Sequence, residues 1–313
     1  MKIRNKKLLT KSIAMAIFMS STLYTMPITY AAFNNNTLPE YISGTGNVGI
    51  SHNNNVMNVS QTEQNAVIQW KDFSIGANAT VNFNGPSTGF NTLNYVNGGN
   101  LSQIYGTINA TNGNIYIVNP AGVQIGNSAQ INVGSLYVSN KNLDENKLSE
   151  FKGNNFNSLI DTSKTSNAEL MSLGNINAAN KVTFDGNRIV LDVDRVKNGQ
   201  NPLEAKDITI KTTQTDFNNK DVVLGYTAYD DRVDDNSKKI GYKYTTDKNN
   251  SSTSLAKLIL ENNTTKDITK ADGFMWVKDG EQLQAMNTNL SGNYAFRNSI
   301  DLNSTADKNV TFN

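Results

Sequence analysis

Two stretches near the N-terminus contain residue types that could bind a nucleotide or a metal ion. GTGNVG, from Gly44 to Gly49, has the glycine spacing of a dinucleotide-binding loop. Such a loop opens a helix, but the next residues, ISHNNNVMNVSQ, are asparagines and β-branched residues that start helices poorly. His52 is the only histidine, and no nucleophile-elbow glycine pattern lies near it. We interpret the glycines as turn residues and His52 as a solvated loop residue.

One acidic stretch has the residue types of a calcium site, since carboxylate oxygens are the ligands that Ca²⁺ prefers. The spacing of a Ca²⁺ loop is absent, and two lysines follow immediately. We therefore interpret the stretch as the charged tip of a hairpin. Its acidic members are Asp230, Asp231, Asp234 and Asp235.

A second acidic group, Asp192 and Asp194, has residue types that glycoside hydrolases use as a carboxylate pair. The two aspartates lie two residues apart on one expected strand, and the sequence assigns no partner to them on a neighbouring segment. We predict no catalytic residue, no metal site and no cofactor.

The composition of the chain favours short strands joined by turns. About 50 of the 313 residues are asparagine, and Gly, Ser and Thr are also plentiful, a balance that disfavours helix. There is no cysteine, which excludes disulfides and thiolate metal sites. The net charge of +1 lacks the basic excess of nucleic-acid-binding proteins, so we expect no nucleic-acid partner.

The first residues have the three parts of a secretory signal peptide. Five basic residues within the first eleven precede the apolar run SIAMAIFMSSTLY, and PITYAA then ends in small residues. The apolar run is too short to span a bilayer of about 30 Å, and no later segment could span one as a helix. We predict a signal peptide over residues 1–31, cleaved after Ala31 or Ala32, and no stable membrane insertion.

Apolar residues alternate in short groups between about Thr80 and Val138, with Gly, Asn or Pro between groups. A period of two indicates strands, and strands this short and regular are typical of a sandwich, a barrel or a parallel β-helix. An internal repeat favours the β-helix. GTINATNGNIYI, from Gly106, is echoed 68 residues later by GNINAANKVTF, from Gly174. We interpret this offset as three coils of about 22 residues, with asparagines stacked at the corners along the axis.

The pattern weakens after Lys141. A polar stretch predicts a short helix around Glu145 to Phe151, which would cover one side of the coils or end one. The sequence from Val222 to Thr246 predicts a hairpin with two tyrosine-rich arms. Leu283, Met286 and Leu290 have helical spacing before another strand-like stretch.

Residues 48–138 resemble the secretion domain of two-partner-secreted exoproteins, the family of filamentous haemagglutinin and the high-molecular-weight adhesins. The match runs through NAVIQWKDFSIG, TVNFNGP, LNYVNGGNLSQIYGTINA, NIYIVNPAGVQIG and INVGSLYVS. The family motif Asn-Pro-Asn-Gly-Ile stands here as Asn119, Pro120, Ala121, Gly122 and Val123, with the third and fifth positions changed. An earlier Asn-Pro-Asn-Leu motif is missing.

The resemblance implies an all-β fold, a right-handed parallel β-helix with an N-terminal cap and extra-helical antiparallel hairpins. It implies a secretion domain over residues 32–200, a β-rich extension with a hairpin over 201–270, and the start of an adhesin-like passenger over 271–313. The motif positions that it assigns to the secretion domain are Asn119, Pro120, Gly122 and Val123 at the turn, and Trp70, Phe73, Gly76, Asn94 and Gly106 elsewhere.

The resemblance also implies a partner and a location. The partner is an outer-membrane β-barrel transporter of the Omp85/TpsB type, which recognises the chain through its periplasmic domains. The protein would pass through the periplasm and outer membrane of a Gram-negative bacterium to become secreted or surface-exposed, where a host-cell surface ligand is a further partner.

The turn chemistry of the motif can be derived from its residues. Pro120 presets φ and cannot extend a strand ladder, Asn119 can bond its own backbone, and Gly122 permits an unusual φ. We predict a sharp corner that serves the fold first and export through the fold. Two alternatives stay open, a secreted β-helix enzyme acting on polysaccharide and a truncated remnant of a longer adhesin. Acidic or arginine residues clustered on one exposed face would favour the enzyme, and a groove without them a binding module.

Overall fold

The computed structural model describes residues 34–87, 89–193, 196–198, 208–212, 222–227, 229–233, 237, 239–244, 254–260 and 265–297. The chain divides into two compact units. The larger unit comprises residues 31–222 and 254–268, and the smaller one comprises residues 1–30, 223–253 and 269–313. The predicted signal peptide lies outside the described residues.

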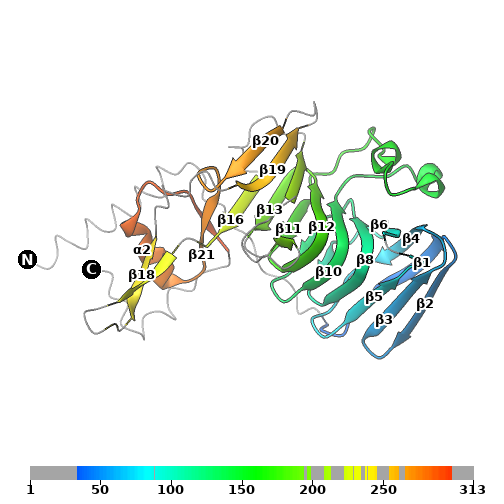
Figure 1. Ribbon diagram of the computed structural model, residues 1–313, viewed down its shortest axis with the longest axis horizontal. Coiled ribbons are helices and arrows are strands. Elements are labelled where there is room, and N and C mark those ends of the chain that lie inside the picture. The colour runs from blue at the N-terminus through cyan, green and yellow to red at the C-terminus, as the bar shows by residue number, and fades with distance from the viewer. Residues whose placement is uncertain are drawn as a thin grey trace, which may run out of the picture. The chain divides into compact units, whose positions relative to one another are not determined.

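The larger unit is a right-handed parallel β-helix, as predicted. Its main sheet has the order β1-β4-β6-β8-β10-β12-β15-β19-β20. A branch β2-β3-β5 joins this sheet through the pairing of β5 with β8, and β14 pairs with β12. A second parallel sheet joins β7, β9, β11 and β13. Figure 1 shows the strands of successive coils lying side by side in chain order.

Most strands of the larger unit are short, as the turn-rich composition predicts, but β8, β10 and β12 are longer, with 12, 10 and 11 residues. The main sheet contains β1 (Glu40–Thr45), β2 (Val48–Asn53), β3 (Val56–Gln61), β4 (Asn65–Asp72), β5 (Thr80–Asn84), β6 (Asn91–Val96), β8 (Thr107–Val118), β10 (Gln130–Ser139), β12 (Asn175–Asp185), β14 (Val196–Asn198), β15 (Ile208–Thr212), β19 (Ser254–Leu260) and β20 (Thr265–Thr269). The second sheet contains β7 (Ser102–Ile104), β9 (Val123–Ile125), β11 (Glu169–Ser172) and β13 (Arg188–Asp192).

The interior is filled by columns of aliphatic side chains, because alternate residues of every strand point inward and neighbouring coils stack in register. Burial of this apolar surface, at about 25 cal/mol per Å², is the main stabilising contribution to such a stack. One column is fully buried at equivalent positions of β5, β8, β10 and β12: Val81, Ile108, Ile131 and Ile176.

The outward positions of the same strands carry a ladder of five asparagines. Each side-chain Nδ2 donates to the Oδ1 of the preceding coil, at 3.0 Å in all four steps. The members are Asn58, Asn82, Asn109, Asn132 and Asn177. The predicted stacking of asparagines is therefore confirmed. This ladder lies within the strands, where flat stacking of coils brings identical side chains together. A second, shorter ladder stands directly after turns, as predicted for corners: Nδ2 of Asn91 donates to Asn65 Oδ1 at 2.8 Å, and Nδ2 of Asn114 donates to Asn91 Oδ1 at 3.0 Å.

The predicted coil count of the repeat is wrong. The repeat segments lie on β8 and β12, and only β10 stands between them in the sheet. The 68-residue offset therefore spans two coils: Thr107 pairs with Gln130, 23 residues on, and Gln130 pairs with Asn175, 45 residues on. The second coil is longer because residues 141–168 leave the helix between β10 and β11.

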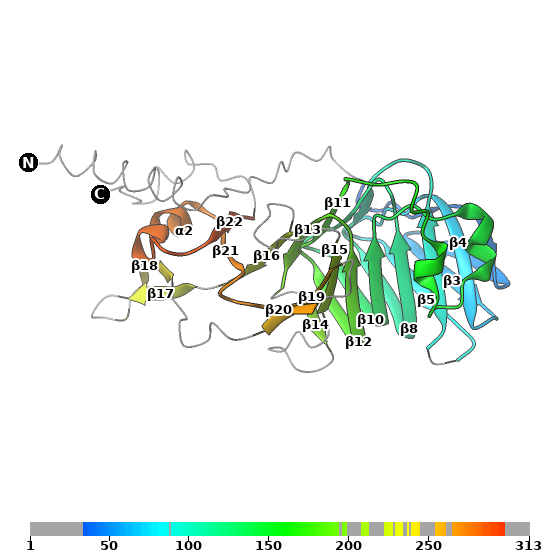
Figure 2. The same ribbon diagram turned by 90° about the horizontal axis from the view of Figure 1, so that it is seen from above.

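Residues 141–168 form a cover segment on the outer face of the main sheet. It contains two 3₁₀ helices, η1 (Glu145–Glu150) and η2 (Phe156–Leu159). Apolar residues of the segment pack on Val67, Leu93, Tyr95 and Val118, which point outward from β4, β6 and β8. Figure 2 shows the segment outside the stacked strands. The predicted short helix exists, as a 3₁₀ helix, and it covers one side of the coils.

The N-terminal end of the helix is capped by antiparallel strands, as predicted. β1 pairs antiparallel with β4, and β2 pairs antiparallel with β3. Tyr41 of β1 packs edge-on against Trp70, with ring centroids 6.0 Å apart. This pairing supplies backbone partners to the first coil, whose edge would otherwise be open.

The smaller unit contains β16 (Val222–Tyr226), β17 (Tyr229–Val233), β18 (Lys239–Tyr244), β21 (Phe274–Val277), α2 (Gly280–Ala285), η3 (Met286–Thr288) and β22 (Tyr294–Phe296). β17 and β18 form the predicted antiparallel hairpin. The predicted helical segment is α2 with η3, and β22 is the strand after it. Among the residues that the structure describes, no helix is long and apolar enough to cross a membrane.

Candidate functional site

Asn119 begins the corner between β8 and β9, and its side chain is buried, with 1% of the residue exposed. Its Oδ1 accepts a hydrogen bond from the Ala121 backbone N at 2.8 Å. The backbone N of Gly122 donates to the Asn119 carbonyl at 2.9 Å, which closes the turn. Asn first, Pro second and Gly fourth are the residues that a type I turn favours. The predicted sharp corner is therefore present.

The Asn119 side chain also joins this corner to the preceding coil. Its Nδ2 donates to the Asn100 carbonyl at 2.8 Å and to Ser102 Oγ at 2.9 Å. On the other side, the backbone N of Asn119 donates to the Ser139 carbonyl of the next coil at 2.9 Å. The Asn119 side-chain amide thus holds stacked coils together and is buried away from solvent.

Gly122 brings the corner close to β11, in the same next coil as Ser139. Its φ of +102° lies in the region that favours glycine. A Cβ at this position would lie 2.7 Å from the Glu169 carbonyl of β11. Val123 follows as the first residue of β9, fully buried between Ser102 and Leu170. Pro120 accepts at its carbonyl from Ser166 Oγ at 2.6 Å, which ties the end of the cover segment to the corner.

Trp70 and Asn94 form a buried pair inside the first coils. Nε1 of Trp70 donates to Asn94 Oδ1 at 3.0 Å, and both residues are fully buried. Nδ2 of Asn94 donates to the Tyr116 carbonyl at 3.1 Å. Phe73 packs edge-on against Trp70, with ring centroids 5.3 Å apart. Because an unpartnered buried amide costs about 1–3 kcal/mol, each member of this pair depends on the other.

Gly76 and Gly106 stack at another corner. A Cβ on Gly106 would lie 2.2 Å from the Gly76 carbonyl oxygen, and one on Gly76 would lie 2.3 Å from the Asn35 carbonyl. Coils can approach this closely only where the side chain is a hydrogen. The structure therefore gathers the nine predicted motif residues at three places in the coil stack, while their role in export stays a prediction.

The glycine-rich stretch and His52, which were considered for nucleotide or metal binding, lie in a turn and on a strand of the N-terminal cap. Gly46, at φ +84°, and Asn47, at φ +54°, make the turn between β1 and β2, so GTGNVG opens no helix. His52 is solvated, as predicted, but it lies on strand β2 opposite Met57 and not in a loop.

The acidic groups form no described metal site. Asp230 and Asp231 lie on β17, whereas Asp234, Asp235 and Asp194 fall outside the described residues. Asp192 ends β13 and is 1% exposed. Within the described part of the chain, His, Asp and Glu residues nowhere gather in threes as metal ligands would.

A buried tyrosine with a raised pKa lies beside the cover segment. The Tyr137 hydroxyl donates to Asp185 Oδ2, and Lys141 Nζ lies 4.0 Å from Oδ1. Burial, followed by the negative charge of Asp185, raises the pKa of Tyr137 well above its ordinary value of 10. Burial also raises the pKa of Tyr116, whose ring stacks on Tyr137. Both hydroxyls stay protonated at neutral pH, which suits packing better than proton transfer.

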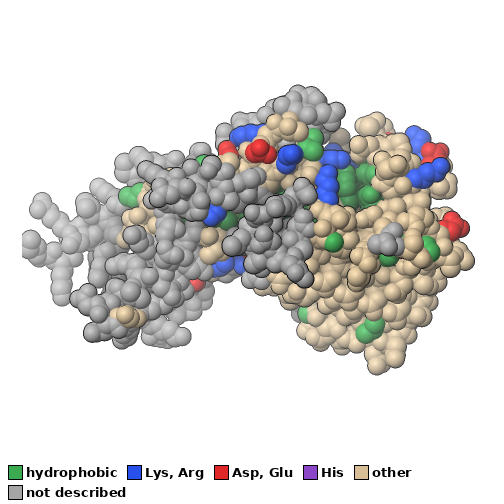
Figure 3. Space-filling model, in the orientation of Figure 1, with side chains coloured by type: hydrophobic (Ala, Val, Ile, Leu, Met, Phe, Trp, Pro, Cys, Tyr) green, Lys and Arg blue, Asp and Glu red, His purple; other side chains and the backbone are tan. Residues whose placement is uncertain are grey.

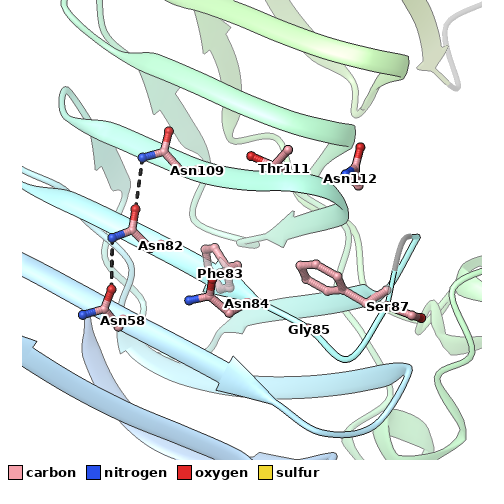
Figure 4. Close-up of a pocket in the computed structure, with 10 residues that line it drawn as sticks. Asn58, Asn82, Phe83, Asn84, Gly85, Ser87, Asn109, Thr111 and Asn112 are labelled. Atoms are coloured by element: carbon pink, nitrogen blue, oxygen red, sulfur yellow. Dashed lines mark hydrogen bonds between the residues drawn. The ribbon is translucent and has the colours of Figure 1, made fainter.

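A polar groove of about 370 Å³ lies on the outer face of β3, β5 and β8. Figure 4 shows the first three ladder asparagines along one side of it. Its lining is formed by Asn58, Asn82, Phe83, Asn84, Gly85, Ser87, Phe90, Asn109, Thr111 and Asn112. Sequence reasoning missed this groove, and also missed Ser102 and Asn100 as partners of Asn119. The equal register of asparagines in successive strands was the signal that could have indicated the groove.

A family model described as the TPS secretion domain matches residues 36–305 of the chain. The chain is also similar to two heme/hemopexin-binding proteins. One, from Haemophilus influenzae strain Rd, is 33% identical over 161 residues, which is 50% of this chain and 18% of that protein. The other, also from Haemophilus influenzae, is 38% identical over 118 residues, covering 38% of this chain and 12% of the relative. The chain thus spans under a fifth of either relative's length.

Among solved structures, the HMW1 secretion domain from Haemophilus influenzae matches with a TM-score of 0.39 and 19% sequence identity. The match covers 77% of this chain and 52% of that one.

Proposed function

Because the chain belongs to the TPS secretion-domain family, whose members are secreted through the outer membrane of Gram-negative bacteria, we propose that its β-helix directs its own export and then nucleates folding. The partner in this proposal is a cognate outer-membrane transporter of the TpsB type, which receives the chain through periplasmic domains. The observation that carries the proposal is the family match over residues 36–305.

The geometry of the motif supports a role in folding. Asn119 bonds to the coil before it and to the coil after it, and Gly122 packs closely against that following coil at Glu169. The turn bonds of this corner are local, but its bonds to Asn100, Ser102 and Ser139 form only when neighbouring coils are in place. We propose that the motif aids export by fixing where coils begin to stack, and that any direct contact with the transporter is made before Asn119 is buried.

The outer surface supports a binding module over a polysaccharide-cleaving enzyme. The described residues that line the groove include no Asp, Glu or Arg. Figure 3 shows few charged side chains over the coils around it. Glycoside hydrolysis needs a pair of carboxyl groups across the bond that breaks. We propose that the protein first binds its transporter and, once exported, binds a host-cell surface ligand. In this proposal residues 271–313 begin an adhesin-like passenger.

Export of matched variants from a host with and without the cognate transporter tests the proposal. Asn119→Ala is compared with Asn140→Ala, since Asn140 occupies the same place after β10, is 1% exposed and donates through Nδ2 to the Ala168 carbonyl at 2.7 Å. Culture medium is assayed for the chain, and the purified variants are unfolded in urea while circular dichroism is recorded.

We expect export to need the transporter and to fall in both variants in proportion to their lost stability, because both corners hold coils together. If Asn119→Ala abolished export while Asn140→Ala, equally destabilised, was exported normally, the motif would instead be a recognition element. Release of the wild-type chain without any transporter would overturn the proposed function.

A further inference from the structure

The polar groove has a rim that is held in place from two sides. The loop between β5 and β6 forms one wall, and Ser87 Oγ on it donates to Gln64 Oε1 at 2.7 Å. The same loop is tied to the opposite wall, because the backbone N of Gly89 donates to the Asn112 carbonyl at 2.6 Å. Phe90 is buried at the base of this loop, where a Cβ on Gly85 or Gly113 would clash with its ring. The groove is therefore preformed.

The asparagine ladder gives the groove an ordered row of hydrogen-bonding groups. A primary amide has two N–H donors and an oxygen with two lone pairs. The ladder bonds of Asn82 and Asn109 use one donor of each amide and one lone pair of its oxygen. The second donor and second lone pair of each amide are held in a fixed orientation, so a ligand that uses them loses little side-chain entropy of the protein.

The remaining lining sets the chemical class of the ligand. Asn84, Ser87 and Thr111 are exposed on the walls and add further amide and hydroxyl groups. The described lining contains no charged side chain that would attract an ion, and its two aromatic residues are 3–4% exposed, too little for an apolar peptide. Groups that both donate and accept, without charge, match the hydroxyls of a neutral sugar.

We propose that this groove binds a neutral oligosaccharide, laid along the ladder in an extended conformation. Neighbouring strands lie about 4.8 Å apart, so the amides repeat at about that distance. An extended β-linked glycan repeats its sugars at a similar distance, so successive sugars meet successive asparagines. The site lies away from the Asn119 corner, and binding does not depend on how the chain is exported.

Titration of the purified full chain with cellohexaose and with chitohexaose, followed by calorimetry, tests the proposal. Thr111→Leu places an apolar group in the groove, where it would leave sugar hydroxyls without partners. Ala179→Leu is the matched control, because Ala179 takes the same place in the repeat on β12, two coils away, and is exposed there. Asn84→Leu is a second groove variant on a different strand.

We expect one of the two glycans to bind, and each groove variant to weaken binding by about tenfold or more, as expected when buried hydroxyls lose a partner. Ala179→Leu should bind like the wild type. Absence of binding of both glycans at millimolar concentration would overturn the proposal, and so would wild-type affinity in both groove variants. Binding of heparin in place of the neutral glycans would show that the site selects charge, which also contradicts it.

Discussion

The outer face of the main sheet is built in two different ways along the same strands. On the first half of β8 and β10, Asn109 and Asn132 point outward and bond to each other along the ladder. On the second half, Tyr116 and Tyr137 point outward from the same two strands, stacked with ring centroids 5.4 Å apart. The first half of β8 lines the groove, and the second halves of both strands lie under the cover segment.

The difference shows what a stacked coil requires of its surface. Stacked amides satisfy one another and still bind water, so the ladder half needs no further protein. Stacked tyrosines and the nearby Leu93 and Val118 would expose apolar area to solvent if they were left uncovered. Residues 141–168 cover this area. Three experiments test this difference, since the two halves should respond differently to truncation and to pH.

The largest effect is expected from truncation under the cover segment. Phe156 is 4% exposed and contacts Tyr116 and Tyr137, with ring centroids 5.8 and 4.5 Å away. Phe156→Ala should lower the free energy of unfolding by about 3–5 kcal/mol, as for other buried aromatic residues. Urea unfolding measures the change, and Phe156→Leu should cost less than about 1.5 kcal/mol. A loss for Phe156→Ala no larger than that of the leucine variant would mean that the cover segment packs loosely.

A smaller effect is expected on the ladder half. Asn109→Ala removes two ladder hydrogen bonds, to Asn82 and to Asn132, and should cost about 2 kcal/mol. Asn58→Ala removes one and should cost about half as much. Urea midpoints of the two variants give the comparison. Equal losses would indicate that the ladder bonds do not contribute separately, and no loss at either site would leave the ladder without a role in stability.

The smallest effect is expected from alkaline pH, and only on the tyrosine half. Burial raises the pKa of Tyr137 in the folded chain, so above pH 10 the unfolded state loses the proton first and unfolding becomes easier. Stability should be unchanged by this group below pH 10 and should fall above it, by at most about 1.4 kcal/mol per pH unit. In urea unfolding between pH 8 and 11, Tyr137→Phe should decline less steeply than the wild type. Asn109→Ala should keep the wild-type slope, and a change in its slope would contradict the separation of the two halves.

Local chemistry made part of the fold predictable. The alternation of apolar residues identified the strands, and Asn119, Pro120 and Gly122 predicted a corner, because turn geometry depends on neighbouring residues alone. The number of coils in the repeat was not predictable in the same way. A segment that leaves the helix, such as residues 141–168, adds length without adding a coil, and only the pairing of β10 with both β8 and β12 distinguishes the two cases.

Contacts between coils could not be predicted from the sequence. Trp70 and Asn94 were both identified from the resemblance, yet their hydrogen bond depends on the register in which Ile68 pairs with Asn94. The groove required the same information, since it combines β3, β5 and β8 with a loop. Residues that meet through register are separated by one coil of chain, and their types alone do not indicate the partner.

The ladder also solves a problem of alignment that apolar alternation leaves open. A coil that slips by one residue turns its aliphatic side chains outward. The loss of apolar burial is enough to prevent such a slip. A slip of two residues keeps every inward residue inward, and hydrophobicity barely distinguishes it from the native pairing. Such a slip of β10 on β8 would set Asn132 opposite Thr107 or Thr111 in place of Asn109, and the amide pair would be lost. The five asparagines therefore select the native register, because their hydrogen bonds form only when each coil is aligned with the one before it.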